Sequence, residues 1–139
     1  MKHFYSFAVG LSLFLAATPL QAKVFYVTTT GTGDGSSWTK AFGSIDDALA
    51  KATSGDEIWI AAGTYKPTQL IKSSKKNSRH FPLKDGVSLY GGFAGTETTK
   101  EARAKKEGGE AYEYVHETIL SADDDVADEW VRESNPENP

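Results

Sequence analysis

Residues 31–65, GTGDGSSWTKAFGSIDDALAKATSGDEIWIAAGTY, decide the fold. The stretch opens with glycine, aspartate and serine residues that are typical of a turn. Its middle carries apolar residues at the i, i+3, i+4 and i+7 spacing of one helical face, namely Ile45, Ala48, Leu49 and Ala52. The order of turn, amphipathic helix and buried strand therefore predicts stacked elements in which the helix covers a core.

The ends of the helix and the strand after it are marked by single residues. Ser44, with Asp47 three residues on, predicts an N-cap, and Gly55 predicts the stop. Residues 56–62 contain the unbroken apolar run Ile58-Trp59-Ile60, which suits a strand in a parallel sheet or one buried on both faces. Residues 63–65, Gly-Thr-Tyr, form the expected exit turn.

Residues 1–22 have the features of a secretory signal peptide. A short basic start at Lys2 and His3 precedes an apolar run that is shorter than a membrane span and ends near Pro19. Ala22 provides a small residue at the cut, so we expect Lys23 to begin the exported chain. This predicts a secreted or cell-surface (outer-membrane) protein with no membrane span after cleavage.

The composition narrows the range of partners. The 139-residue chain has 15 Lys and Arg against 19 Asp and Glu, a formal net charge of −4. An acidic balance argues against nucleic acid and against anionic membranes as main partners. The chain has no cysteine, which removes thiol chemistry and disulfides, so stacked repeats are the expected source of stability.

Further strands recur along the chain. Residues 24–27, Val-Phe-Tyr-Val, form one β-type run, and strands are expected to start near Ile58, Val87 and Ile119. The last three are separated by about 30 residues, a period that suggests stacked coils. Residues 98–106 are expected to be helical, and 123–139 form an acidic tail rich in proline and asparagine.

Four segments together resemble a known family. They are GTGDGSSW (31–38), AFGSIDDALAKATSGDEIWIAAGTYKPT (41–68), FPLKDGVSLYGGFAGTET (81–98) and ETILSAD (117–123). In this order they resemble the N-terminal part of secreted pectate-lyase-like proteins, of the kind common on Bacteroidetes cell surfaces. The resemblance implies a mainly β, right-handed parallel β-helix. Residues 23–122 would form its cap helix and first coils, and the chain would be an incomplete solenoid.

Two clusters of charged residues are candidate binding sites. The acidic residues at the start of the tail are weak candidate calcium ligands (Asp123, Asp125 and Asp128), because adjacent side chains point apart; a solvated acidic loop is the favoured interpretation. A basic loop is a candidate contact for a polysaccharide or cell-surface glycan (Lys72, Lys75, Lys76 and Arg79), although an ordinary solvated loop is the favoured interpretation.

Other patterns are better explained by structure than by chemistry. Residues 31–37 suit a connecting turn more than an anion-binding nest, and the aromatic residues of the fold-defining segments suit core packing more than sugar stacking. Neither His80 nor His116 has a sequence partner for a triad or a metal pair, and no catalytic or cofactor-binding residue is identified. The sequence predicts a non-catalytic, glycan-binding or adhesin-like segment. The alternative is the N-terminal portion of a polysaccharide lyase acting on acidic glycans.

Overall fold

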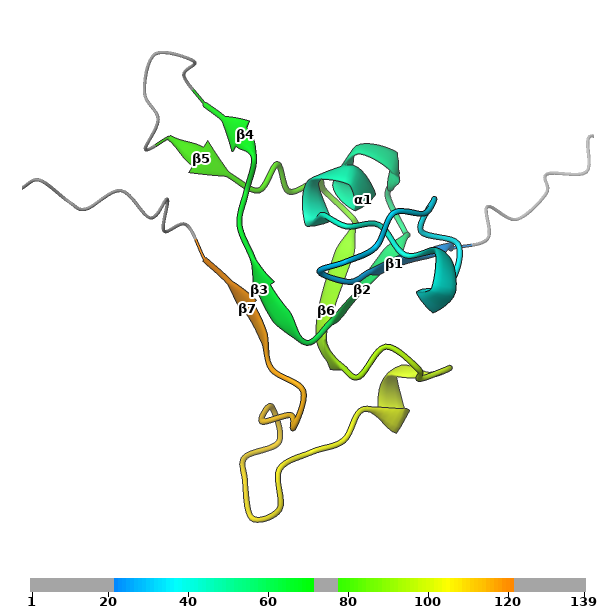
Figure 1. The fold of residues 1–139 in the computed structure, drawn as a ribbon, viewed down its shortest axis with the longest axis vertical. Helices are drawn as coiled ribbons and strands as arrows, with labels where there is room; N and C mark the ends of the chain where they lie inside the picture. Colours follow the sequence, from blue (N-terminus) through cyan, green and yellow to red (C-terminus); the bar gives the residue numbers. More distant parts are fainter. Residues whose placement is uncertain (1–21, 72–77, 122–139) are drawn as a thin grey trace, which may run out of the picture.

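The computed structural model describes residues 22–71 and 78–121. Its first sheet contains three parallel strands, β1 (Val24–Val27), β2 (Glu57–Ala61) and β6 (Ser88–Phe93), in the order β1-β2-β6 (Figure 1). The predicted signal peptide, apart from Ala22, and the predicted tail 123–139 lie outside the described residues.

The three strands stack in register up to Trp59, after which β6 has one extra residue relative to β2. Ile58 lies between Phe25 of β1 and Leu89 of β6. The strand predictions at 24–27, 56–62 and 87–90 are thus confirmed as strands, and β6 extends further than predicted, to Phe93. Parallel neighbours need long crossover connections, and the helix and the loops between the strands supply them.

A second parallel pair lies beside this sheet. Residues 63–65, predicted as an exit turn, instead form strand β3 (Gly63–Tyr65). It pairs with β7 (Thr118–Leu120), with Thr64 opposite Ile119. The strand predicted near Ile119 therefore exists, but the expectation that it continues the spacing of Ile58 and Val87 is wrong, because it joins the other sheet.

The reason lies in the two connections between the sheets. A single residue, Ala62, joins β2 to β3, whereas residues 94–117 join β6 to β7. Ala62 N–H donates to the Phe93 carbonyl at 2.8 Å, and Gly63 N–H donates to the Glu117 carbonyl at 2.9 Å. The corner between β2 and β3 therefore lies directly beside the corner between β6 and β7. Residues 94–117 are a long insertion at the corner between β6 and β7. We call residues 94–117 the corner insertion; in Figure 1 it is the yellow segment that extends below the sheets.

The remaining elements are short. Strands β4 (Gln69–Leu70) and β5 (Arg79–His80) pair antiparallel and project from the body (Figure 1). A 3₁₀ turn, η1 (Trp38–Lys40), precedes the helix, and another, η2 (Lys100–Ala102), lies in the corner insertion. The helix predicted over 98–106 is therefore reduced to this one turn.

Helix α1 (Ile45–Lys51) confirms the predicted helix and its cap. The Ser44 hydroxyl accepts from Asp47 N–H at 3.1 Å and donates to the Asp47 carboxylate at 2.8 Å. Ser44 therefore provides a hydrogen-bond partner for a backbone N–H that has none within the helix. The predicted stop at Gly55 is wrong, because the helix ends at Lys51 with the extended Ala52 as its C-cap; Gly55, at φ +94°, lies in the turn before β2. The predicted apolar face is buried, with Ile45, Ala48 and Leu49 at most 1% exposed.

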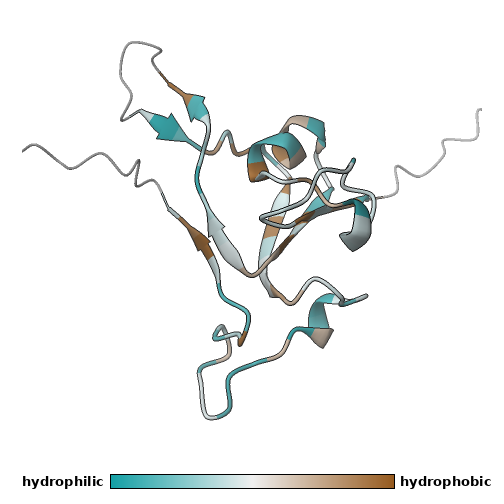
Figure 2. Cartoon of the chain, viewed as in Figure 1, coloured by the Kyte–Doolittle hydropathy of each residue, from teal (hydrophilic) through white to brown (hydrophobic). Residues whose placement is uncertain are grey.

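The core lies between this helix and the first sheet. It contains Val27, Phe42, Ile58, Ile60 and Tyr65 together with the helix face. The described part is thus mixed, with two small parallel sheets, one antiparallel pair and few helices. Within these residues no helix has the length and apolar character needed to cross a bilayer. In Figure 2, β7 is brown, and its Ile119 and Leu120 are about half exposed.

Candidate functional site

An open hollow of about 430 Å³ lies where β6, β7 and the corner insertion meet. The strands form one wall and the insertion the other. Its lining is Leu89, Tyr90, Gly91, Gly92, Arg103, Lys106, Tyr112, Glu113, Tyr114, His116, Glu117, Thr118 and Ile119. Aromatic rings and paired charges therefore share one concave surface, a mixture typical of small-molecule sites.

Arg103 holds the corner insertion against β6. Its guanidinium donates from Nη1 to the Gly91 carbonyl at 2.9 Å, and its Nε donates to the Lys100 carbonyl at 2.7 Å. The same group lies 4.3 Å from the ring centroid of Tyr114 and 5.1 Å from that of Phe93. Hydrogen bonds and cation–π contacts together fix the side chain between strand and loop.

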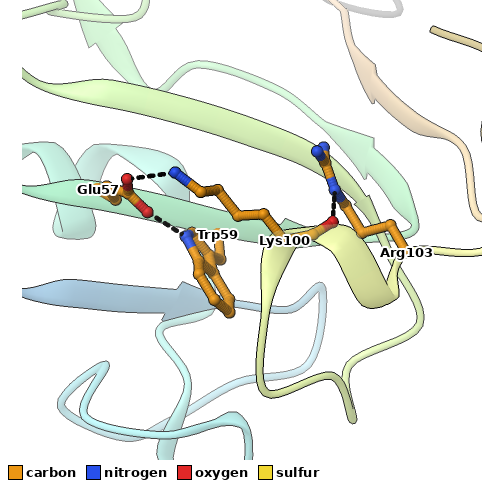
Figure 3. A network of polar contacts seen from close by, with 4 residues as sticks. All are labelled: Glu57, Trp59, Lys100 and Arg103. Carbon is orange, nitrogen blue, oxygen red and sulfur yellow. Dashed lines mark hydrogen bonds and ion pairs between the residues drawn. The ribbon is translucent and has the colours of Figure 1, made fainter. Parts of the chain in front are cut away.

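An ion pair attaches the insertion to β2. Lys100 Nζ lies 2.6 Å from Glu57 Oε1, and Trp59 Nε1 donates to Glu57 Oε2 at 2.8 Å (Figure 3). Residues 57 and 59 share one face of the strand, which lets one carboxylate accept from the indole two residues on. Lys100 Nζ also lies 4.4 Å from the ring centroid of Tyr90.

This pair is electrostatically stabilised. Burial opposes ionisation of Glu57, but the hydrogen bonds from Lys100 and Trp59 outweigh it and hold the pKa of Glu57 below its ordinary value. The hydrogen bond to Glu57 in turn raises the pKa of Lys100. Both groups are therefore charged at neutral pH.

The start of the insertion is fixed by Glu97. Its carboxylate accepts from the backbone N–H groups of Ala94, Gly95 and Thr96 at 2.7–3.0 Å. Burial opposes its ionisation, but these donors hold the pKa of Glu97 below its ordinary value. The Glu97 carbonyl also accepts from Trp38 Nε1 at 2.7 Å, which ties the turn to η1.

The floor of the hollow requires two glycines. Gly92 N–H donates to Thr118 Oγ1 at 3.0 Å, and that oxygen lies 3.1 Å from the carbonyls of Ile60 and Ala61. A Cβ on Gly91 would lie 2.7 Å from Thr118, and one on Gly92, where φ is +88°, would lie 2.6 Å from the Tyr114 ring. The close approach of β6 to β7 and to the insertion therefore depends on the absence of side chains here.

The cations that line the hollow have partners. Lys106 pairs with Glu117, and this contact raises the pKa of Lys106 and lowers that of Glu117. Arg103 is held by carbonyls, as above. Tyr112, by contrast, is 76% exposed at the rim. The surface can therefore offer an aromatic face and neutralised polar groups to a ligand.

Most residues predicted as binding sites lie elsewhere. Lys72, Lys75 and Lys76, and the calcium candidates Asp123, Asp125 and Asp128, lie outside the described residues. Arg79 is exposed on β5, opposite Leu70, and is not part of the hollow. Among the described residues no group of three or more His, Cys, Asp and Glu side chains is placed to hold a metal ion. His116 lines the hollow, and His80 lies on β5.

The turn and the core aromatics agree with their structural interpretations. Gly33 and Gly35 N–H donate to the carbonyls of Ala41 and Lys40 at 2.9 and 2.7 Å, so these donors are already used by the turn. Trp59, Tyr65 and Phe93 are at most 5% exposed, as core packing predicts, whereas Tyr90 is half-buried and lines the hollow. The hydroxyl of Tyr65 donates to the Ala61 carbonyl at 3.0 Å, and burial raises its pKa to about 12.

Sequence reasoning missed the residues that build the hollow. Arg103, Tyr112 and Tyr114 fall in a segment without apolar periodicity, and only the density of cations over 100–106 marks it. Comparison with protein-family models, with curated proteins and with solved structures finds no match to this chain.

Proposed function

We propose that this chain is a non-catalytic, glycan-binding segment of a secreted or cell-surface right-handed parallel β-helix protein. Its cap helix α1 would close the first coil, and β1, β2 and β6 would be successive rungs of one face. The hollow beside the corner insertion would be the binding surface.

The observation that supports the fold is the pair of matched corners. β2 and β6 pair in parallel, the strands that follow them, β3 and β7, also pair in parallel, and the corners between them are joined by hydrogen bonds at Ala62 and Gly63. Two successive turns of chain that repeat the same path and bond rung to rung are the unit of a β-solenoid. The resemblance of the sequence points in the same direction.

The observation that supports glycan binding is the chemistry of the hollow. Tyrosine rings provide flat apolar faces for sugar rings, and neighbouring polar groups can bond hydroxyls. Because Lys106 and Arg103 are engaged by Glu117 and by backbone carbonyls, the lining favours a neutral glycan over a polyuronate.

A binding assay tests the proposal directly. Residues 23–139 are titrated by calorimetry with a panel of neutral and uronic-acid oligosaccharides. We expect a neutral oligosaccharide to bind, and Tyr112→Ala to weaken it about tenfold, equivalent to about 1.4 kcal/mol. Leu83→Ala is the matched control, because Leu83 is 69% exposed and lies outside the hollow.

Two results would contradict the proposal. Equal binding by wild type and Tyr112→Ala would remove the hollow as the site. Release of unsaturated uronic-acid product from pectin or alginate, with or without calcium, would show the chain to be a lyase and would establish the alternative function.

A further inference from the structure

A buried carboxylate immediately precedes β2, at the opposite end of the strand from the corner at Ala62. Asp56 is 6% exposed and has hydrogen bonds at both oxygens. Its Oδ1 accepts from the backbone nitrogen of Lys23 at 2.9 Å. Its Oδ2 accepts from the N–H and the hydroxyl of Thr53 at 2.8 and 2.9 Å. These donors, the bond from Lys23 first, hold the pKa of Asp56 below its ordinary value against the effect of burial.

The donor from Lys23 has a special position in the chain. It belongs to the bond between Ala22 and Lys23, where the sequence predicts cleavage of the signal peptide. The Lys23 carbonyl is fixed as well, because it accepts from Glu57 N–H at 2.8 Å. The next residue, Val24, pairs with Glu57 in the sheet.

We infer that Asp56 is the binding site for the α-ammonium group of Lys23 that cleavage after Ala22 creates. In this hydrolysis, catalysed by a signal peptidase, the C–N bond breaks and the water oxygen joins the Ala22 carbonyl carbon. Ala22 leaves as a carboxylate, and the Lys23 nitrogen gains two protons and becomes –NH₃⁺. The inference rests on the predicted cleavage and is independent of glycan binding.

The contact differs in strength between the folded uncleaved chain and the folded cleaved chain. In the uncleaved chain a neutral amide donates to the buried carboxylate; in the cleaved chain a cation does, and charge-assisted hydrogen bonds are roughly twice as strong. Lys23 is exposed, so the remaining protons of the ammonium can be hydrated. The Thr53 donors keep the carboxylate in place. The new terminus thus forms an ion pair with Asp56, and this ion pair holds β1 against the start of β2.

The same geometry sets the order of events. A protease binds its substrate as an extended chain, but in the fold both backbone groups of Lys23 are engaged and Val24 lies in the sheet. Cleavage must therefore precede docking of β1, and docking then captures the new terminus.

The pH dependence follows from the groups around the contact. Besides Asp56 these are the Lys23 and Lys84 side chains, Asp85 in the adjacent turn, and Glu57, whose carboxylate is turned to Lys100. A free α-amino group titrates at about 7.7–8.0. Pairing raises that pKa in the fold. Its stabilisation is therefore complete below about pH 7.7 and is lost as the pH rises through the folded value.

The test compares defined N-termini. Residues 23–139 are prepared with a native Lys23 terminus by removing an N-terminal fusion, and a second protein carries the extension Gln21-Ala22. Both are also made with Asp56→Asn. Thermal unfolding is measured at pH 7 and pH 9.5, and the α-amino pKa of Lys23 is followed by NMR. Mass spectrometry of the exported full-length product separately identifies the cleavage site.

We expect the Lys23 terminus to have the higher Tm at pH 7, by about 4–8 °C for a domain of this size. The difference should shrink at pH 9.5 and vanish in Asp56→Asn, and the Lys23 α-amino pKa should exceed that of a free terminus. Equal Tm values for the two termini at pH 7, or a difference that persists in Asp56→Asn, would overturn the inference. Cleavage at another bond would overturn the processing prediction but leave the glycan proposal standing.

Discussion

The rings of Trp59 and Phe93 lie face to face, with centroids 4.9 Å apart and planes inclined by 13°. They belong to neighbouring strands but are not register partners, because Trp59 pairs with Tyr90, and Phe93 pairs with Ala61. Between these pairs Gly91 and Gly92 face one residue of β2. This bulge in β6 carries Phe93 over Trp59 and opens the wall of the hollow.

Gly92→Ala should destabilise the protein. A left-handed conformation costs an L-residue about 1–2 kcal/mol, and the new Cβ would also meet the Tyr114 ring. Gly55→Ala is the control, since Gly55 has φ +94° but a Cβ there would meet nothing within 4 Å beyond its chain neighbours. We expect a larger loss of unfolding free energy in urea for Gly92→Ala. Equal losses would mean that Tyr114 moves freely.

Leu49→Asp should prevent folding. Leu49 is 0% exposed in the core, where truncation of a leucine to alanine alone costs about 2–5 kcal/mol and a buried, unpaired charge costs more. Ala50→Asp places the same side chain on the exposed face of α1 and should leave a cooperative transition. Circular dichroism during heating distinguishes the two. An unchanged melting curve for Leu49→Asp would show that α1 does not cover the core.

Glu57→Gln should lower the Tm at pH 7 through loss of the charge paired with Lys100. Because the folded pKa of Glu57 is depressed, its contribution is present above the ordinary value of 4.5 and is lost as the pH falls through the folded value. The difference in Tm between wild type and Glu57→Gln should therefore decrease as the pH falls below 4.5. Glu117→Gln is the control, since its pair with Lys106 is more exposed and should contribute little. A difference in Tm that is independent of pH would contradict a stabilising charge pair between Glu57 and Lys100.

Ile119→Lys should reduce self-association of residues 23–139. Within the described residues β7 pairs only with β3, and Ile119 is 49% exposed. A strand edge with exposed apolar side chains can pair with another molecule, and a lysine there opposes it. Sedimentation velocity should show a concentration-dependent species for wild type and less of it for Ile119→Lys. Thr64→Lys, on the partner strand, is the control. A wild-type chain that stays monomeric at all concentrations would contradict the prediction.

Local patterns predicted the elements better than their partners. The spacing from Ile45 to Ala52 and the cap at Ser44 depend on neighbours within one helical turn, so they can be read from the sequence. The assignment of Ile119 failed because equal spacing says nothing about which side of a corner a strand lies on; that depends on the length of the corner insertion.

The hollow could not be predicted for a related reason. Arg103 meets Tyr114 and the Gly91 carbonyl across loops that have no repeating pattern. Contacts of this kind depend on where the strands place the ends of the insertion. The basic segment around 100–106 was the only feature of the sequence that pointed to the hollow.

The unequal corners have a consequence for how such a chain can change. One residue at Ala62 and a whole insertion at 94–117 occupy equivalent places, yet the strands on either side keep their pairing. Length at a corner is thus free to vary while the scaffold stays constant. A new segment could be inserted at Ala62, next to the corner insertion. A recognition surface could then be built from loops at successive corners, each selected independently of the strands that carry it.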